Sequence, residues 1–553
     1  MMTTRRIFLQ VSSGALAGSL IGCGGGGDDN PVVDTTSGKF SGTVSGGTAI
    51  YKGIPYAQPP VGALRFQSPR PYVPVTAQVT PATAFGPASL QTLPANVTWI
   101  YTQPTAQSED CLTLNIWAPR GMGKAPVVVW LHGGAWRTGA TSMPLMDGQR
   151  LAEQGLVVVT VNYRLGAMSS LAHPDFTDPE TGLAANWGLQ DQAAALRWVH
   201  ENIARFGGDP GNVCLAGQSA GAVNTALIAQ HPVWNQWLHK AVLLSSAGIA
   251  APAGFTLQDA ASYTELLATS LKTTPKGLLG IPAATLHAAE LALNAQPLPS
   301  TFRSGFGVKA SPVMDGKTVF ADWTRVAWPQ RVPVLITNTL TEGSFFVDLV
   351  DPATQASLTA PLPSSMEELT ALVAPLSGSA SRASQVIGSY QSEALADRRS
   401  PAPGNLWVEI NGDRNLRNFC VRYADSLVKQ GANVRYGTFM HELPAPGRGV
   451  PHCAELPFLF GTYGLDYYRQ KVGSGAAEQQ LSRHLMSAMT TFAQSGTATF
   501  ADGTVWQSYG SGNTSSALIG PGASSSIAFG TVPKIAQMRV WDALLGYPSS
   551  ERA

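Results

Sequence analysis

The chain lacks the features that mark several large classes of protein. Charged residues make up only 13% of its 553 positions and the formal net charge is +1. This balance argues against a nucleic-acid partner or an electrostatic membrane scaffold. No run of lysine and arginine with interleaved aromatic residues appears. No apolar run reaches the roughly 18 residues that a transmembrane helix needs. We therefore expect membrane contact only through the N-terminus.

Signals for a metal or a cofactor are also missing. The nine histidines are scattered, without the His-Glu-x-x-His or paired Cys-x-x-Cys spacing of metal sites. The glycine run at 24–27 lacks the lysine and the helix of a phosphate-binding loop, so it is low-complexity sequence. We expect no metal and no cofactor.

Cysteine is scarce, with five residues in the chain. Cys214 falls in a predicted central strand, and Cys453 lies beside a candidate catalytic histidine. Together with Cys111 and Cys420, they are expected to be buried thiols for the most part, without a disulfide framework.

The first residues resemble an address signal. Arg5 and Arg6 precede Ile-Phe-Leu, as in the signal of the twin-arginine export route. A short apolar segment then ends in Leu-Ile-Gly-Cys, which resembles a bacterial lipoprotein box with lipidation at Cys23. The alternative is an ordinary cleaved signal peptide with a chance cysteine.

These signals divide the chain into three parts. Residues 1–22 are predicted to be an export signal, 23–37 a lipid-anchored flexible tether, and 38–548 one large catalytic domain. The protein is expected in the periplasm or cell envelope of a bacterium. Its oligomeric state is left open.

Several short runs of Val, Ile and Leu predict strands that are buried on both faces. Between many of them lie helical patterns, such as Gly188–Phe206. This alternation predicts an α/β fold with a large, mostly parallel central sheet covered on both sides. The segments 250–300 and 351–400 are predicted to be helical insertions over the sheet. The predicted strands are Val127–Leu131, Leu156–Val161, Val213–Ala216, Ala241–Leu244, Val334–Ile336 and Val434–Phe439.

The most informative stretch is Gly217-Gln218-Ser219-Ala220-Gly221. It joins a predicted strand to a predicted helix, which is the context of a nucleophile elbow. Ser219 would stand on a sharp turn with its hydroxyl exposed. Glycine is needed two residues either way, because a side chain there would collide with the neighbouring strand or helix.

Other polar groups also follow predicted strands. His132 to Trp136 come directly after Leu131, Glu342 comes shortly after Ile336, and His452 lies in the loop after Phe439. Ligands of open parallel sheets bind beyond the carboxyl ends of the strands. We therefore expect these loops to converge with Ser219 at one edge of the sheet.

Long blocks of sequence support a family resemblance, which runs from about residue 42 to 541. The chain resembles a type-B carboxylesterase, the cholinesterase-like branch of the α/β-hydrolases, and that fold is what the resemblance implies. The similar blocks are YKGIPYAQPPVGALRF at 51–66, SEDCLTLNIW at 108–117, NWGLQDQ at 186–192 and FGGDP at 206–210.

By this resemblance Ser219 is the nucleophile, Glu342 the acid and His452 the base, in the chain order that this fold uses. The oxyanion-binding amides would be those of Gly134, Ala135 and Ala220.

Alternatives for two of these positions stay open. The residues themselves also allow Asp315 or Asp348 as the acid. His441, at a strand end, and His484, in a helical pattern, compete with His452 as the base.

The chain departs from the family pattern around the pocket. The residue before the nucleophile is often glutamate in this family, and here it is Gln218, so we expect no special attraction for cationic, choline-like alcohols. Trp136, Trp99 and Tyr101 are expected to line an apolar pocket with Gln218, and Trp187 either lines it or packs in the core.

A second departure concerns a disulfide. The family often pairs the cysteine at position 111 with one about twenty residues earlier, where this chain has Ser89. The loop 90–107 is therefore expected to be mobile.

The resemblance implies a serine esterase that hydrolyses small uncharged carboxylic esters through an acyl-enzyme intermediate. The same triad could instead cleave carbamates or amides. Lipase action, with the insertions as a lid, is less favoured. A non-catalytic cholinesterase-like binding protein is disfavoured because all three triad residues are present.

Overall fold

The computed structural model describes most of the chain. The export signal, Cys23 and Asp348 lie outside the described residues. The residues that the structure describes are 30–75, 77–94, 97–245, 255–299, 302–304, 307–308, 312–320, 326–345, 361–444, 449–510 and 515–546.

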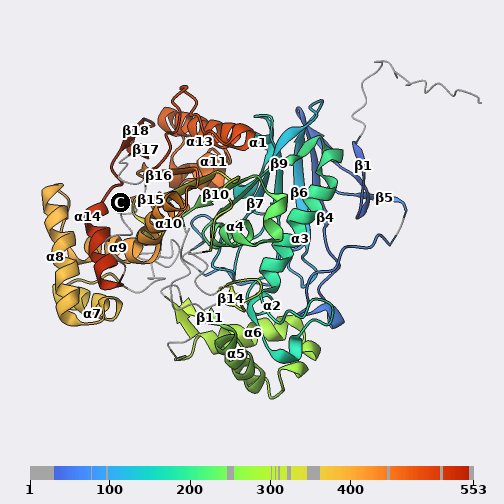
Figure 1. Cartoon of the computed structure of the whole chain (residues 1–553), viewed down its shortest axis with the longest axis horizontal. Helices are drawn as coiled ribbons and strands as arrows, with labels where there is room; N and C mark the ends of the chain where they lie inside the picture. The colour runs from blue at the N-terminus through green and yellow to red at the C-terminus, as the bar shows by residue number, and fades with distance from the viewer. Residues whose placement is uncertain are drawn as a thin grey trace, which may run out of the picture.

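An 11-stranded sheet forms the centre of the fold, in the order β18-β17-β16-β15-β10-β9-β7-β8-β6-β4-β3 (Figure 1). Its strands from β17 to β8 in that order are parallel, which confirms the mostly parallel α/β sheet. The strands are β3 (Thr43–Ser45), β4 (Thr48–Pro55), β6 (Thr113–Pro119), β7 (Ala125–Leu131), β8 (Val157–Val161), β9 (Gly208–Gln218), β10 (Lys240–Leu244), β15 (Val334–Thr339), β16 (Val434–His441), β17 (Ser516–Gly522) and β18 (Ile527–Gly530).

The two edges of the sheet are antiparallel: β18 pairs with β17 at one edge, and β6, β4 and β3 extend the other. A smaller sheet, in the order β1-β2-β5, lies beside the second edge. Its strands are β1 (Val32–Thr35), β2 (Gly38–Ser41) and β5 (Val79–Pro81).

Each face of the large sheet carries its own hydrophobic core. Val127 and Val129 of β7 pack into the core with α3, α4 and α10. Val128 and Trp130 of the same strand point into the core with α1, α11 and α13. This alternation explains why the central strands are apolar at every position. The helices are α1 (Gln149–Ala152), α3 (Trp187–Asn202), α4 (Ala220–Gln230), α10 (Asn418–Lys429), α11 (Leu456–Leu459) and α13 (Ala476–Ser495).

The segments between strands form two smaller helical groups, as predicted for the insertions. One contains α2, α5 and α6 and has its own core, in which Trp187 is fully buried. Trp187 is thus a core residue. The other contains α7, α8, α9 and α14. The helices of these two groups are α2 (Ala167–Ser170), α5 (Leu257–Ser270), α6 (Ala283–Asn294), α7 (Met366–Ser377), α8 (Ala380–Ala396), α9 (Pro403–Gly412) and α14 (Ile535–Leu544). Helix α12 (Asp466–Val472) instead packs into the core with α11 and α13.

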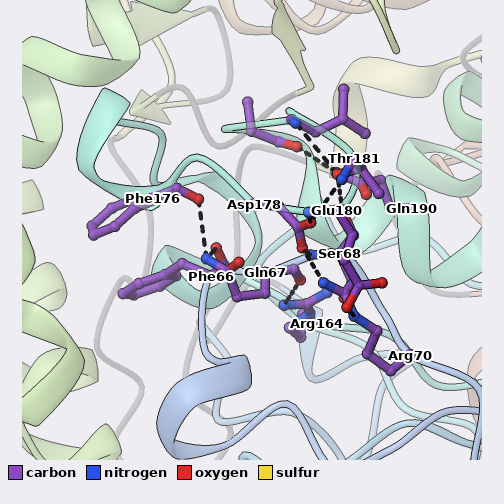
Figure 2. A network of polar contacts seen from close by, with 12 residues as sticks. Phe66, Gln67, Ser68, Arg70, Arg164, Phe176, Asp178, Glu180, Thr181 and Gln190 are labelled. Atoms are coloured by element: carbon purple, nitrogen blue, oxygen red, sulfur yellow. Dashed lines mark hydrogen bonds and ion pairs between the residues drawn. The ribbon is translucent and has the colours of Figure 1, made fainter.

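A polar network ties the N-terminal block to the segment between β8 and α3 (Figure 2). The carboxylate of Asp178 accepts hydrogen bonds from the backbone amides of Ser68, Glu180 and Thr181 and from the guanidinium of Arg70. Burial alone raises the pKa of Asp178, but these donors outweigh it and lower that pKa below its usual value.

Beside this network, Arg164 donates to the backbone oxygen of Gln67 and pairs with Asp191 of α3, with 2.6 Å between Nη2 and Oδ1. The NWGLQDQ block thus supplies an internal ion pair.

Among the described helices, none combines the length and the apolar character needed to cross a bilayer.

Candidate active site

Ser219 stands at the junction of β9 and α4 in a strained backbone conformation, with φ 56° and ψ −126°. A Cβ on Gly217 would overlap the backbone of Gly221, and one on Gly221 would overlap the carbonyl of Leu131. The glycines therefore allow the sharp turn, for the reason that the sequence predicted. The turn also places Ser219 as the N-cap of an 11-residue helix, whose dipole favours negative charge there.

The loop after β7 approaches the same serine. Gly134, Ala135 and Trp136 have consecutive positive φ angles of 116°, 52° and 58°. A Cβ on Gly133 would lie only 2.9 Å from Cβ of Ser219. A glycine there therefore lets this backbone pass directly beside the nucleophile position. Ala220, the third residue expected to supply an amide, begins α4.

Glu342 and His452 are in direct contact although 110 residues separate them. Oε2 of Glu342 lies 2.6 Å from Nδ1 of His452. Oε1 of Glu342 accepts a hydrogen bond of 2.8 Å from the backbone amide of Thr339. Both side chains are buried, so the contact is shielded from water.

The other ring nitrogen of His452 faces Gln218, whose Nε2 lies 3.0 Å from Nε2 of the imidazole. An amide nitrogen only donates, so this ring nitrogen accepts and the imidazole proton resides on Nδ1, toward Glu342. That is the tautomer in which Nε2 can take a proton. Gln218 itself is fully buried, and its Oε1 has no hydrogen-bond partner among the described residues.

The loops that carry the acid and the base are joined by two hydrogen bonds. The amide of Thr341 donates to the carbonyl of Val450, and the amide of Val450 donates to the hydroxyl of Thr341. Glu342 follows Thr341 and His452 lies two residues after Val450, so the pair is held at both ends.

The sequence predicts no role for Glu455, three residues after His452. It is buried, and neither carboxyl oxygen hydrogen-bonds to another described residue. Burial, followed by the negative charge of Glu342, raises the pKa of Glu455 to about 8. Its apolar surroundings, Cys-Ala before it and Leu-Pro-Phe-Leu after it, are the signal that could have indicated a buried acid.

Buried aromatic side chains pack around His452. The ring of Phe345 packs edge-on against the imidazole, with 5.3 Å between centroids, and Trp99 packs edge-on against Phe345 at 6.0 Å. Tyr101 is buried in the same core as Trp99. Trp136 lies in the other core layer and donates through its indole N–H to Asn224 of α4.

The competing acids and bases are engaged elsewhere. Asp315 accepts backbone hydrogen bonds from Lys317, Thr318 and Val319 in its own turn. Nε2 of His441 lies 3.3 Å from Glu478, and Nε2 of His484 lies 3.0 Å from the amide of Gln480.

The loop 90–107 is held by several contacts despite the missing disulfide. Gln91 forms hydrogen bonds with the side chain of Gln107 and with the backbone of Gly139. The hydroxyl of Tyr468 donates a further hydrogen bond to the carbonyl of Ile100. These contacts oppose the mobility expected from the sequence. Cys111, Cys214, Cys420 and Cys453 are all buried, and among the described residues none of them forms a disulfide, as predicted.

Across the part of the chain that the structure describes, no group of three or more His, Cys, Asp or Glu side chains could hold a metal ion. The chemistry available is therefore a hydroxyl on a strained elbow, a buried carboxylate–imidazole pair and closely spaced backbone amides.

Comparisons with known proteins agree with this chemistry. The sequence model of the carboxylesterase family matches residues 29–535 of this chain. The chain is 34% identical to para-nitrobenzyl esterase of Bacillus subtilis over 84% of its own length and 90% of that protein. It is 39% identical to phenmedipham hydrolase of Pseudarthrobacter oxydans over 44% of its own length and 48% of that protein.

Solved structures show the same fold. A structure of PNB esterase superposes with a TM-score of 0.75 at 30% identity, covering 94% of this chain and all of that chain.

Proposed function

The chain belongs to the carboxylesterase family and is a carboxylic ester hydrolase, and on that premise we propose that it cleaves small uncharged esters through an acyl-enzyme formed on Ser219. The observation that carries this proposal is the buried contact of 2.6 Å between Glu342 and His452, on loops that follow neighbouring parallel strands of the same sheet as Ser219.

In the proposed mechanism, the hydroxyl oxygen of Ser219 attacks the ester carbonyl while Nε2 of His452 takes the hydroxyl proton. The protonated ring then gives that proton to the departing alcohol. Glu342 holds the Nδ1 proton and stabilises the imidazolium without itself becoming protonated. A water molecule then attacks the acyl-enzyme while Nε2 of His452 takes its proton. The protonated ring gives that proton to the oxygen of Ser219, and the carboxylic acid is released.

Negative charge develops on the former carbonyl oxygen during both steps. We assign the amides of Gly134, Ala135 and Ala220 to that oxygen, because they come from the two turns that meet at Ser219. Each such donor contributes roughly 3 kcal/mol to lowering the barrier.

The preference for uncharged esters rests on Gln218. An amide there supplies no negative charge for a cationic alcohol. Acetylcholine and its carbon isostere, 3,3-dimethylbutyl acetate, present nearly the same shape with and without a charge. The proposal predicts no preference for acetylcholine, and a strong preference for it would refute the assignment.

The catalytic assignment is tested with a serine-directed phosphonate. The probe should label the native protein on Ser219, as located by peptide mass spectrometry. Ser219→Ala should abolish labelling and lower kcat by about 10⁴-fold or more. Undiminished ester hydrolysis by folded Ser219→Ala would refute the triad.

We further propose that the protein is exported and lipid-anchored at Cys23. The twin arginines and the Leu-Ile-Gly-Cys ending support this location. Mass spectrometry of the N-terminal peptide of the envelope-purified protein tests it, since lipidation adds acyl mass at Cys23.

A further inference from the structure

We infer that the outer face of the small sheet β1-β2-β5 is a docking surface for the phospholipid bilayer to which Cys23 is anchored. This inference rests on the proposed lipidation and not on the esterase activity.

The register of the small sheet separates a buried side from an exposed one. Val33 of β1 pairs with Phe40 of β2, and both are buried against the main domain. Side chains alternate along a strand, so Val32 of β1 and Val79 of β5 lie on the opposite, outer face. These two valines are 56% and 46% exposed.

The segment before β5 adds two exposed valines close to the small sheet. Val73 is 63% exposed and Val75 is 90% exposed. Pro74 lies between them and packs beside the β1–β2 turn, since a Cβ on Gly38 would lie 3.6 Å from the Pro74 side chain. Val73 and Val75 are therefore exposed beside the β1–β2 turn, with Pro74 between them on the Phe40 side of the hairpin.

The charges on this outer face are few. The segment 71–80, Pro-Tyr-Val-Pro-Val-Thr-Ala-Gln-Val-Thr, contains no charged residue. On the outer face, Asp34 and Lys39 lie opposite each other, with 3.8 Å between their charged atoms. An exposed apolar surface with compensated charge is costly to leave in water, and it suits the boundary between headgroups and acyl chains.

The position of the anchor selects the bilayer as the occupant. Val32 is only nine residues after Cys23, so the extended chain between them spans at most about 30 Å. The outer face begins at Val32, where β1 starts within the segment 23–37 that the sequence predicted to be a tether. Figure 1 draws β1 and β5 at one end of the long axis and α7 and α8 at the other. The anchor therefore brings the valine-bearing end of the molecule to the membrane first.

Site-directed spin labelling tests this inference on the envelope-purified, lipidated protein in phosphatidylethanolamine and phosphatidylglycerol vesicles. Val75→Cys and Val79→Cys would carry the label. Val233→Cys and Val505→Cys, from positions 54% and 51% exposed elsewhere in the chain, are matched controls. The thiols of Cys111, Cys214, Cys420 and Cys453 are buried, so labelling is selective for the introduced cysteine.

We expect labels at 75 and 79 to show a several-fold higher ratio of oxygen to aqueous-reagent accessibility than the controls. Equal ratios at all four positions would overturn the inference. Spin–spin broadening at 75 and 79 would overturn it in favour of a second copy of the chain. An unmodified Cys23 would overturn it as well. Ester hydrolysis by the same samples reports folding and the catalytic proposal separately.

Discussion

At the scale of single residues, Gln218 has two consequences for the site. Its amide fixes the tautomer of His452, and because that amide is neutral it adds no negative charge next to the imidazole ring. The residue next to the proposed nucleophile is therefore also in contact with the proposed base.

Gln218→Glu should stabilise the protonated form of the proposed catalytic imidazole, because it would place a carboxylate about 3 Å from Nε2. The acid limb of the pH profile of kcat/KM should move to higher pH, by about one pH unit or more. Gln218→Met, which removes the hydrogen bond without adding charge, is the control and should not produce this upward movement. An unmoved acid limb in Gln218→Glu would contradict the contact.

Glu455 makes the stability of the fold depend on pH. Its carboxyl stays protonated in the folded state up to about pH 8 but ionises near pH 4.5 in the unfolded chain. The folded state therefore binds more protons between these values, and its contribution to stability falls as pH rises through this window.

Glu455→Gln should remove that loss of stability. Between pH 5 and pH 8, the free energy of unfolding of the variant should therefore rise relative to that of the parent by on the order of 3–5 kcal/mol. Denaturant unfolding at the two pH values measures the difference. Glu201→Gln, at an exposed position, is the control and should leave the pH dependence as it is. Parallel pH profiles for the parent and Glu455→Gln would refute the buried acid.

At the scale of elements, the ion pair between Arg164 and Asp191 holds α3 in place. Asp191 accepts hydrogen bonds from the backbone amide, Nε and Nη2 of Arg164, and both side chains are almost fully buried. The pair anchors the start of α3 to the segment that follows β8.

Asp191→Asn should lower the free energy of unfolding by about 3 kcal/mol or more, because it leaves a buried guanidinium without its counter-charge. Glu201→Gln breaks an exposed pair with Arg197 on the same helix and should cost less than about 1 kcal/mol. Chemical denaturation compares the two variants, and similar losses would show that burial of the first pair is unimportant.

The sequence predicted the central strands because apolar, β-branched runs between turns leave little choice. It did not predict β6, where Asn115 lies fully buried within the strand. The amide of Asn115 donates to Thr141 and Thr160, partners that no local pattern reveals.

The same limit applies to the site. The sequence identified Glu342 and His452, and the structure brings them together. The contact between Gln218 and His452 spans 234 residues, and the raised pKa of Glu455 depends on Glu342, so neither could be read from spacing alone.

At the scale of the whole molecule, the described part of the chain is held without disulfides. Two extended cores on the faces of the sheet, each formed by helices and strands far apart in sequence, replace covalent links.

The thermal unfolding midpoint should therefore be the same with and without a thiol reductant. Cys111, Cys214, Cys420 and Cys453 should react with a thiol reagent only after unfolding, as mapped by peptide mass spectrometry. A lowered midpoint in reductant, or rapid modification of the native protein at these positions, would contradict this arrangement.

The paired hydrogen bonds between Thr341 and Val450 make the two loops one mechanical unit. A fluctuation that draws one loop outward carries the other with it, and the proton-relay geometry survives the motion. Any motion that admits reactants and releases products therefore keeps the carboxylate on the ring as long as these two hydrogen bonds hold.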